Sequence, residues 1–173
     1  MSINELLVSL LITVSPVEID DKLVINEFLN KEAVCLTQNV YHEARNQPQA
    51  GQMAVMSVTL NRVKDSRFPN TICGVVKQGP HRPSWKGTGE LIPVRHRCQF
   101  SWYCDGKSDQ PKDLKGYKKA TDVAIQVYSG TIPDVTEGAL WYHATYIRKP
   151  FWAYSFQETV KINEHIFYKR PGR

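Results

Sequence analysis

The stretch Tyr41-His42-Glu43-Ala44-Arg45 closes one predicted helix and lies just ahead of a second helix that starts at Pro48. In the first helix, predicted over residues 32–46, Leu36, Val40 and Glu43 are spaced i, i+4 and i+7 and therefore share one face. A carboxyl group that extends an apolar stripe has a raised pKa, because burial disfavours its charged form, so it can donate a proton near neutral pH. The pattern makes Glu43 a candidate general acid, although an ordinary solvated glutamate could have the same spacing.

The second helix, residues 49–66, is apolar on nearly every side, which predicts a buried central helix. Its length and its Pro48 start favour a helix over a strand, in spite of several β-branched residues. The rest of the chain predicts a short helix capped by Asn70-Thr71 that runs to about Gln78, an irregular segment punctuated by Gly79 to Gly89, a helix over residues 114–129 and a small hairpin around Asn163-Glu164. The fold class is therefore α+β and mostly helical, with a few short strands.

A series of separated blocks resembles one known family. Besides residues 41–45, the blocks are Gly51-Gln52, Ala54-Val55, Leu60-Asn61-Arg62-Val63, Phe68-Pro69-Asn70-Thr71 with Cys73, Cys98-Gln99-Phe100-Ser101-Trp102, Cys104-Asp105-Gly106, Gly138-Ala139-Leu140-Trp141-Tyr142-His143, Trp152-Ala153 and His165-Ile166-Phe167-Tyr168. Ordered agreement over about residues 33–168 is far more specific than a single short motif. On these blocks, the chain resembles the spore cortex-lytic enzyme family of cell wall hydrolases.

The resemblance implies a lysozyme-like fold and cleavage of peptidoglycan glycan strands between N-acetylmuramic acid and N-acetylglucosamine. It also implies a lytic transglycosylase mechanism in which Glu43 is the catalytic residue. The family more often has Gly-Glu directly after the arginine, where this chain has Asn46-Gln47. Asparagine tolerates a left-handed helix end, so we expect the geometry to survive. The missing acid at Gln47 leaves open whether a second carboxylate tunes Glu43 or activates water.

Two alternatives keep the same substrate. A hydrolytic muramidase or glucosaminidase would need a second carboxylate several ångströms from Glu43, and Asp105 and Glu137 are the candidates in matched blocks. A peptidoglycan-binding module that has lost catalysis is the other alternative, which the Asn46-Gln47 departure permits and the retained Glu43 opposes.

A glycan cleft needs aromatic platforms beside polar donors and acceptors, since sugar rings have apolar faces and many hydroxyls. Two matched segments have this mixture, and the residues that we expect to bind substrate are Gln99, Ser101, Trp102, Tyr142, His143 and Tyr146. Phe100 and Trp152 are expected in the core. For His143, a hydrogen-bonded core histidine is an equally good interpretation.

Composition agrees with one globular domain, since 42% of the 173 residues are hydrophobic and 23% are charged. We expect residues 31–173 to form the catalytic domain and residues 1–30 to pack on it. The net charge of +5 favours an anionic partner such as peptidoglycan or its acidic polymers. Scattered Lys and Arg residues and the lack of a nucleic-acid motif argue against DNA or RNA. A monomer that needs no cofactor is expected.

The apolar run at residues 6–14 is too short to span a bilayer, and it has neither a preceding Lys or Arg nor a small-residue cleavage site after it. We interpret it as a helix that packs on the domain; a poor signal peptide that ends near Ser15-Pro16 is the alternative. The expectation is an enzyme made in the host bacterial cytoplasm that acts in the periplasm or cell wall, as a bacteriophage endolysin released by a holin does.

Four cysteines, Cys35, Cys73, Cys98 and Cys104, allow three complete pairings, and both buried free thiols and disulfides stay open. Their spacing lacks the close C-x-x-C pair of a zinc site, and the five histidines form no H-E-x-x-H motif. The sequence therefore predicts no metal site and argues against a zinc amidase or peptidase.

Overall fold

The computed structural model describes residues 31–172, and residues 32–172 belong to one compact unit. The predicted helix at residues 6–14 and the predicted packing of residues 1–30 lie outside the described residues. No helix of the described part is long and apolar enough to cross a membrane.

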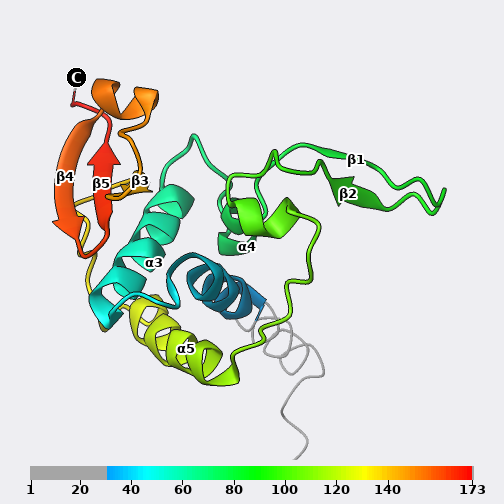
Figure 1. The fold of residues 1–173 in the computed structure, drawn as a ribbon, viewed down its shortest axis with the longest axis horizontal. Coiled ribbons are helices and arrows are strands. Elements are labelled where there is room, and N and C mark those ends of the chain that lie inside the picture. The colour runs from blue at the N-terminus through cyan, green and yellow to red at the C-terminus, as the bar shows by residue number, and fades with distance from the viewer. Residues whose placement is uncertain (1–30, 173) are drawn as a thin grey trace, which may run out of the picture. The chain divides into compact units, whose positions relative to one another are not determined.

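The predicted helices are confirmed, with ends that shift by a few residues (Figure 1). A helix covers residues 31–44, followed by α3 (Gln49–Lys64), α4 (Ile72–Val76) and α5 (Leu114–Tyr128). Short 3-10 helices η1 (Ser101–Cys104) and η2 (Phe151–Ser155) lie between the longer elements. The Thr71 side chain accepts a hydrogen bond from the Gly74 amide at 3.0 Å and caps α4, as the sequence predicts.

Helix α3 is the centre of the core, as its apolar composition predicts. Val55 and Met56 are fully buried, in one cluster with Leu36 and Val40 of helix 31–44 and with Val123 of α5. Each fully buried aliphatic side chain contributes about 1.5–3 kcal/mol through the hydrophobic effect. This packing fixes helix 31–44, and therefore Glu43, against α3.

Three antiparallel strands form a sheet in the order β3-β5-β4. They are β3 (Trp141–Ala144), β4 (Gln157–Ile162) and β5 (His165–Lys169), so the predicted terminal hairpin is confirmed and β3 joins it. Tyr142 pairs with Phe167 in this sheet, and Phe167 packs on Ala54 and Val58 of α3. The sheet is thereby fixed on the helix that also holds Glu43 in place.

The prediction of an irregular segment from Gly79 to Gly89 is partly wrong, because this segment contains one strand of a hairpin. β1 (His81–Pro83) pairs antiparallel with β2 (Leu91–Pro93), and Figure 1 shows this hairpin projecting away from the helices. Its strands are only three residues long and each ends in proline, so the sequence lacks the alternating pattern of a strand.

All four cysteines form disulfides, Cys35–Cys73 and Cys98–Cys104. The first joins helix 31–44 to α4. Beside it, the buried Glu32 carboxylate accepts hydrogen bonds from the Ile72 and Cys73 amides at the start of α4. Because both pairs are oxidised, none of the four cysteines offers a thiolate as a metal ligand.

Candidate active site

Glu43 is partly buried near the end of helix 31–44, and its carboxylate meets a side chain from the sheet. The Tyr142 hydroxyl donates a hydrogen bond to Glu43 Oε2 at 3.1 Å. Burial raises the pKa of Glu43, while the Tyr142 hydrogen bond and the positive charge of Arg62 oppose that rise without cancelling it. A carboxyl group with a raised pKa keeps its proton to higher pH, which is what a general acid requires.

Arg62 of α3 supplies a buried cation to this group. Its side chain is 2% exposed, its Nε donates to the Leu140 carbonyl at 2.8 Å, and its guanidinium lies over the rings of Phe68 and Phe100. Burial lowers the pKa of Arg62, and the charges of Tyr142 and Glu43 raise it. Even so, a guanidinium stays protonated at physiological pH. A fixed positive charge therefore stands near the carboxylate.

Two pockets meet at the end of helix 31–44. A pocket of about 210 Å³ is lined by Glu43 together with Tyr146, Glu164, His165 and residues 44–47. A larger one of about 420 Å³ is lined by Trp102, Asp105 and Asp109 among others, and both pockets share His42 and Arg45. The two pockets therefore adjoin at His42 and Arg45, and of the two, Glu43 lines only the smaller one.

The larger pocket is held by a buried polar network. The Trp102 Nε1 donates to Asn39 Oδ1 at 3.1 Å, and Asn39 Nδ2 donates to Thr59 Oγ1 at 3.2 Å. The His42 ring stacks on Trp102 with 4.4 Å between ring centroids, and its Nε2 lies 3.2 Å from the Asp109 carbonyl oxygen. Trp102 is only 9% exposed, so little of its indole ring is open to a ligand.

The residues expected to bind substrate divide into two groups. Tyr146 lines the Glu43 pocket and Trp102 lines the larger pocket, whereas Tyr142 contacts the Glu43 carboxylate without lining either pocket. Gln99 and Ser101 are exposed and line neither of these two pockets.

His143 is directed away from Glu43. Successive side chains of a strand point to opposite faces, so Tyr142 and His143 of β3 cannot both face the same pocket. The buried His143 has its Nε2 at 3.0 Å from the Tyr168 hydroxyl and its Nδ1 at 2.9 Å from the Ala144 carbonyl oxygen. This arrangement matches the alternative of a hydrogen-bonded core histidine.

The two candidate second carboxylates lie in different places. Asp105 lines the larger pocket, whereas Glu137 is exposed in a turn and lines neither pocket. A third carboxylate, Glu164 in the turn between β4 and β5, lines the Glu43 pocket. The sequence alone did not single it out, because a polar residue in a hairpin turn is ordinary.

Glu164 is held by its neighbours. Gln47 Nε2 donates to Glu164 Oε2 at 2.7 Å, and the Thr145 amide donates to the Glu164 carbonyl oxygen at 2.8 Å. The turn lies so close to α3 that a Cβ on Gly51 would stand 3.0 Å from Asn163 Nδ2 and 2.9 Å from the Gln47 Cβ. Gln47, where the resembled family commonly has glutamate, thus supplies the donor that Glu164 needs; a carboxylate there would repel it.

No group of three or more His, Cys, Asp or Glu side chains within residues 31–172 is arranged to hold a metal ion.

Comparison with known proteins places the chain in a family. The family model described as Cell Wall Hydrolase matches residues 46–168 and so begins three residues after Glu43. The spore cortex-lytic enzyme of Bacillus subtilis is 28% identical over 81% of this chain and 38% of its own length. That of Bacillus cereus is 28% identical over 83% of this chain and 46% of its own length. The chain thus spans less than half the length of these relatives.

Solved structures agree with the fold. The catalytic domain of the Bacillus cereus SleB protein has a TM-score of 0.55 and 26% identity, over 81% of this chain and 91% of that domain. The catalytic domain of the germination-specific lytic transglycosylase SleB from Bacillus anthracis has a TM-score of 0.59 and 28% identity, over 80% and 93%. The predicted α+β, lysozyme-like fold class is confirmed. The chain belongs to the cell wall hydrolase family.

Proposed function

We propose that this chain cleaves peptidoglycan glycan strands between N-acetylmuramic acid and N-acetylglucosamine, as a lytic transglycosylase with Glu43 as its catalytic acid and base. The observation that carries the proposal is the partly buried Glu43 carboxyl group, which lines a pocket and contacts Tyr142 near the buried Arg62. The similarity to a catalytic domain described as a lytic transglycosylase supports it. The predicted monomer and the predicted place of synthesis stay predictions.

The first step transfers a proton. Protonated Glu43 donates to the bridging oxygen of the glycosidic bond while positive charge develops on the muramic acid ring, and the C–O bond breaks. Glu43 becomes a carboxylate in a partly buried site. The Tyr142 hydroxyl and the Arg62 charge both favour that charged form, so they stabilise the product of the proton transfer without being altered themselves.

The second step returns the proton. The Glu43 carboxylate accepts the proton of the muramic acid C6 hydroxyl, whose oxygen then bonds to the anomeric carbon and closes a 1,6-anhydro ring. No water is consumed and Glu43 ends protonated, so the cycle balances with one carboxyl group. An internal hydroxyl has an effective concentration far above that of an unpositioned water, which favours ring closure.

Hydrolysis is the second candidate, and a specific observation favours it. Glu164 lies on the wall of the pocket that Glu43 lines, which supports a mechanism with a second carboxylate, since hydrolysis requires a base that activates water. In that mechanism Glu164 would take a proton from water as the water attacks the anomeric carbon. The substrate and the role of Glu43 as acid are the same in both mechanisms.

Replacing Glu43 by glutamine should remove activity and keep the fold. We expect Glu43→Gln to lower the rate of peptidoglycan solubilisation at least ~10²-fold, the low end for loss of a general acid. Because the pKa of Glu43 is raised in the folded protein, its ionised form costs stability above the unfolded pKa, and glutamine has no such cost. The melting temperature at pH 7 should therefore not fall.

The control is Glu158→Gln, which removes the same charge from an exposed position on β4. Its activity should equal that of the wild type. A folded Glu43→Gln protein that retains more than about a tenth of wild-type turnover would contradict the assignment of the acid.

The pH profile should respond to the Tyr142 hydroxyl. Activity requires protonated Glu43, so it is present below the pKa of Glu43 and lost as the pH rises through it. The hydroxyl lowers that pKa, and Tyr142→Phe should therefore move the alkaline limb of kcat/KM to higher pH. The matched control Tyr146→Phe removes a tyrosine hydroxyl that lines the Glu43 pocket but has no hydrogen bond to Glu43, and it should leave the limb in place. A limb that stays put or moves to lower pH in Tyr142→Phe would refute this electrostatic account.

The contact between Gln47 and Glu164 should behave as a coupled pair. Gln47→Glu sets two carboxylates at hydrogen-bond distance, and we expect kcat/KM to fall about fivefold to tenfold as the turn moves. The double variant Gln47→Glu with Glu164→Gln restores one donor and one acceptor with their roles exchanged. Its kcat/KM should return to within about twofold of wild type in a double-mutant cycle. If the double variant is as impaired as Gln47→Glu, the two residues are not a coupled pair, and the Glu164 carboxylate acts on the substrate directly.

A further inference from the structure

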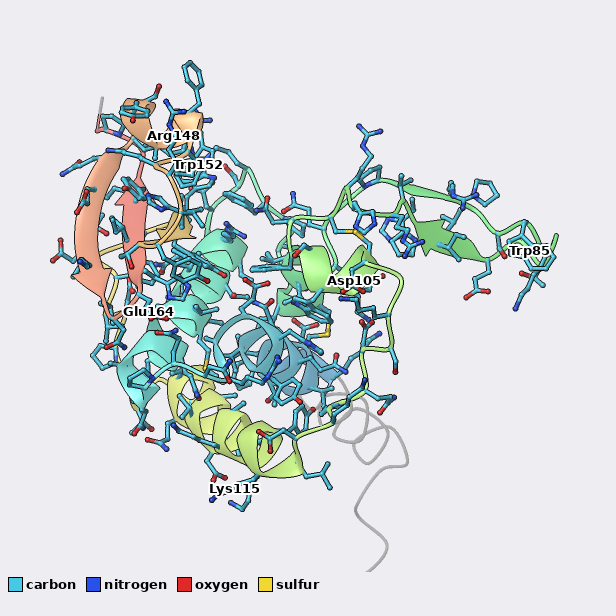
Figure 2. All side chains as sticks on the ribbon, in the orientation of Figure 1. Trp85, Asp105, Lys115, Arg148, Trp152 and Glu164 are labelled. Atoms are coloured by element: carbon cyan, nitrogen blue, oxygen red, sulfur yellow. A yellow bond between two sulfur atoms is a disulfide. The ribbon has the colours of Figure 1, made fainter. Side chains whose placement is uncertain are left out.

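The segment from Lys77 to Arg97, here called the basic hairpin, has properties that the cleavage of glycan strands does not use. It contains β1, β2 and the loop between them, and every residue from 81 to 91 except Ser84 is exposed. Figure 2 shows Trp85 at its outer end, on the opposite side of the molecule from Glu164 in the active-site pocket. We propose that the basic hairpin binds the anionic headgroups of a phospholipid bilayer.

Charge is the first observation. The segment contains five Lys and Arg residues, at positions 77, 82, 86, 95 and 97, all of them exposed, and a single acid, Glu90. Arg95 donates to the Asp105 carbonyl and Lys77 lies over the Tyr103 ring. For the remaining three cations, no carboxylate of residues 31–172 lies within salt-bridge distance. Unpaired exposed cations on a projecting hairpin attract an anionic surface.

Exposed apolar side chains are the second observation. Trp85 is 83% exposed and Leu91 is 63% exposed, although both are large hydrophobic residues. Pro83 pairs with Leu91 and His81 with Pro93, so these four share one face of the hairpin. An indole ring beside lysine is typical of the boundary between headgroups and acyl chains, where its apolar body and its N–H group are both satisfied.

The backbone argues against a partner that would add a strand to the hairpin. Each strand is three residues long and ends in proline, Pro83 in β1 and Pro93 in β2. Proline has no backbone N–H group, so neither position can donate the hydrogen bond that a further strand would accept. Binding must therefore occur through side chains.

A bilayer fits these side chains better than an acidic wall polymer does. An acidic polymer would pair with the cations but would leave Leu91 in water, whereas the interface of an anionic bilayer offers charge and an apolar phase together. A bilayer also places the partner away from the Glu43 pocket, so binding leaves the pocket open to a glycan strand (Figure 2).

The test is co-sedimentation of the full chain with vesicles that contain phosphatidylglycerol and phosphatidylcholine, or phosphatidylcholine alone. We expect the protein to bind only to the anionic vesicles, and this binding should weaken as salt is added. Arg82→Gln with Lys86→Gln should weaken it about 25-fold, at about fivefold for each cation. The matched control Lys115→Gln with Lys119→Gln makes the same charge change on exposed positions of α5 and should bind like the wild type.

The apolar part of the proposal has its own variant. Trp85→Ala should weaken vesicle binding and remove a blue shift of tryptophan fluorescence that the wild type shows on anionic vesicles. All hairpin variants should retain wild-type activity on soluble glycan fragments, so the result is independent of the proposed reaction. Three outcomes would overturn the proposal: no binding to anionic vesicles, an equal loss in the α5 control, or hairpin variants that lose binding to purified peptidoglycan while vesicle binding is unchanged.

Discussion

The hydrogen bond from Tyr142 to Glu43, made close to the buried Arg62, joins the three parts of this fold. Glu43 comes from helix 31–44, Arg62 from the central helix α3 and Tyr142 from strand β3. A buried cation is costly unless its donors and charge are compensated. Here the Leu140 carbonyl and two aromatic faces compensate part of that cost. The helices and the sheet must pack correctly for these groups to meet, so the fold and the acidity of Glu43 depend on the same contacts.

The turn between β4 and β5 brings a second carboxylate to the pocket that Glu43 lines. Gly51 allows the turn to approach α3, and the turn carries Glu164 to the pocket wall. Glutamine at position 47 then donates to Glu164 across 117 residues of sequence. The pocket thus contains a carboxylate from a part of the chain that is distant from Glu43 in sequence.

The sequence predicted the elements whose signals are local. The spacing of Leu36, Val40 and Glu43 and the apolar α3 are properties of single helices, and both are confirmed. The same spacing made Glu43 a candidate acid, and the resemblance to cell wall hydrolases then assigned it the catalytic role. The hairpin of β1 and β2 was missed because its prolines hide the strand pattern.

The rest of the site depends on contacts between distant segments. Arg62 could have been noticed as a charged residue within an apolar helix, since such a residue must find a partner. Glu164 has no local signal, because only the packing of its turn on Gly51 brings it to the pocket. The choice between Tyr142 and His143 needed the assignment of β3, after which strand alternation allows only one of them to face Glu43.

The most direct test of the central claim is mass analysis of the fragments that the purified protein releases from peptidoglycan. If Glu43 alone serves as acid and base, the muramic acid ends are 1,6-anhydro, lighter by one water than hydrolysed ends and resistant to borohydride reduction. Fragments with mainly reducible muramic acid ends would contradict a transglycosylase. They would instead show that water was the nucleophile and make Glu164, on the wall of the same pocket, the first candidate for its base.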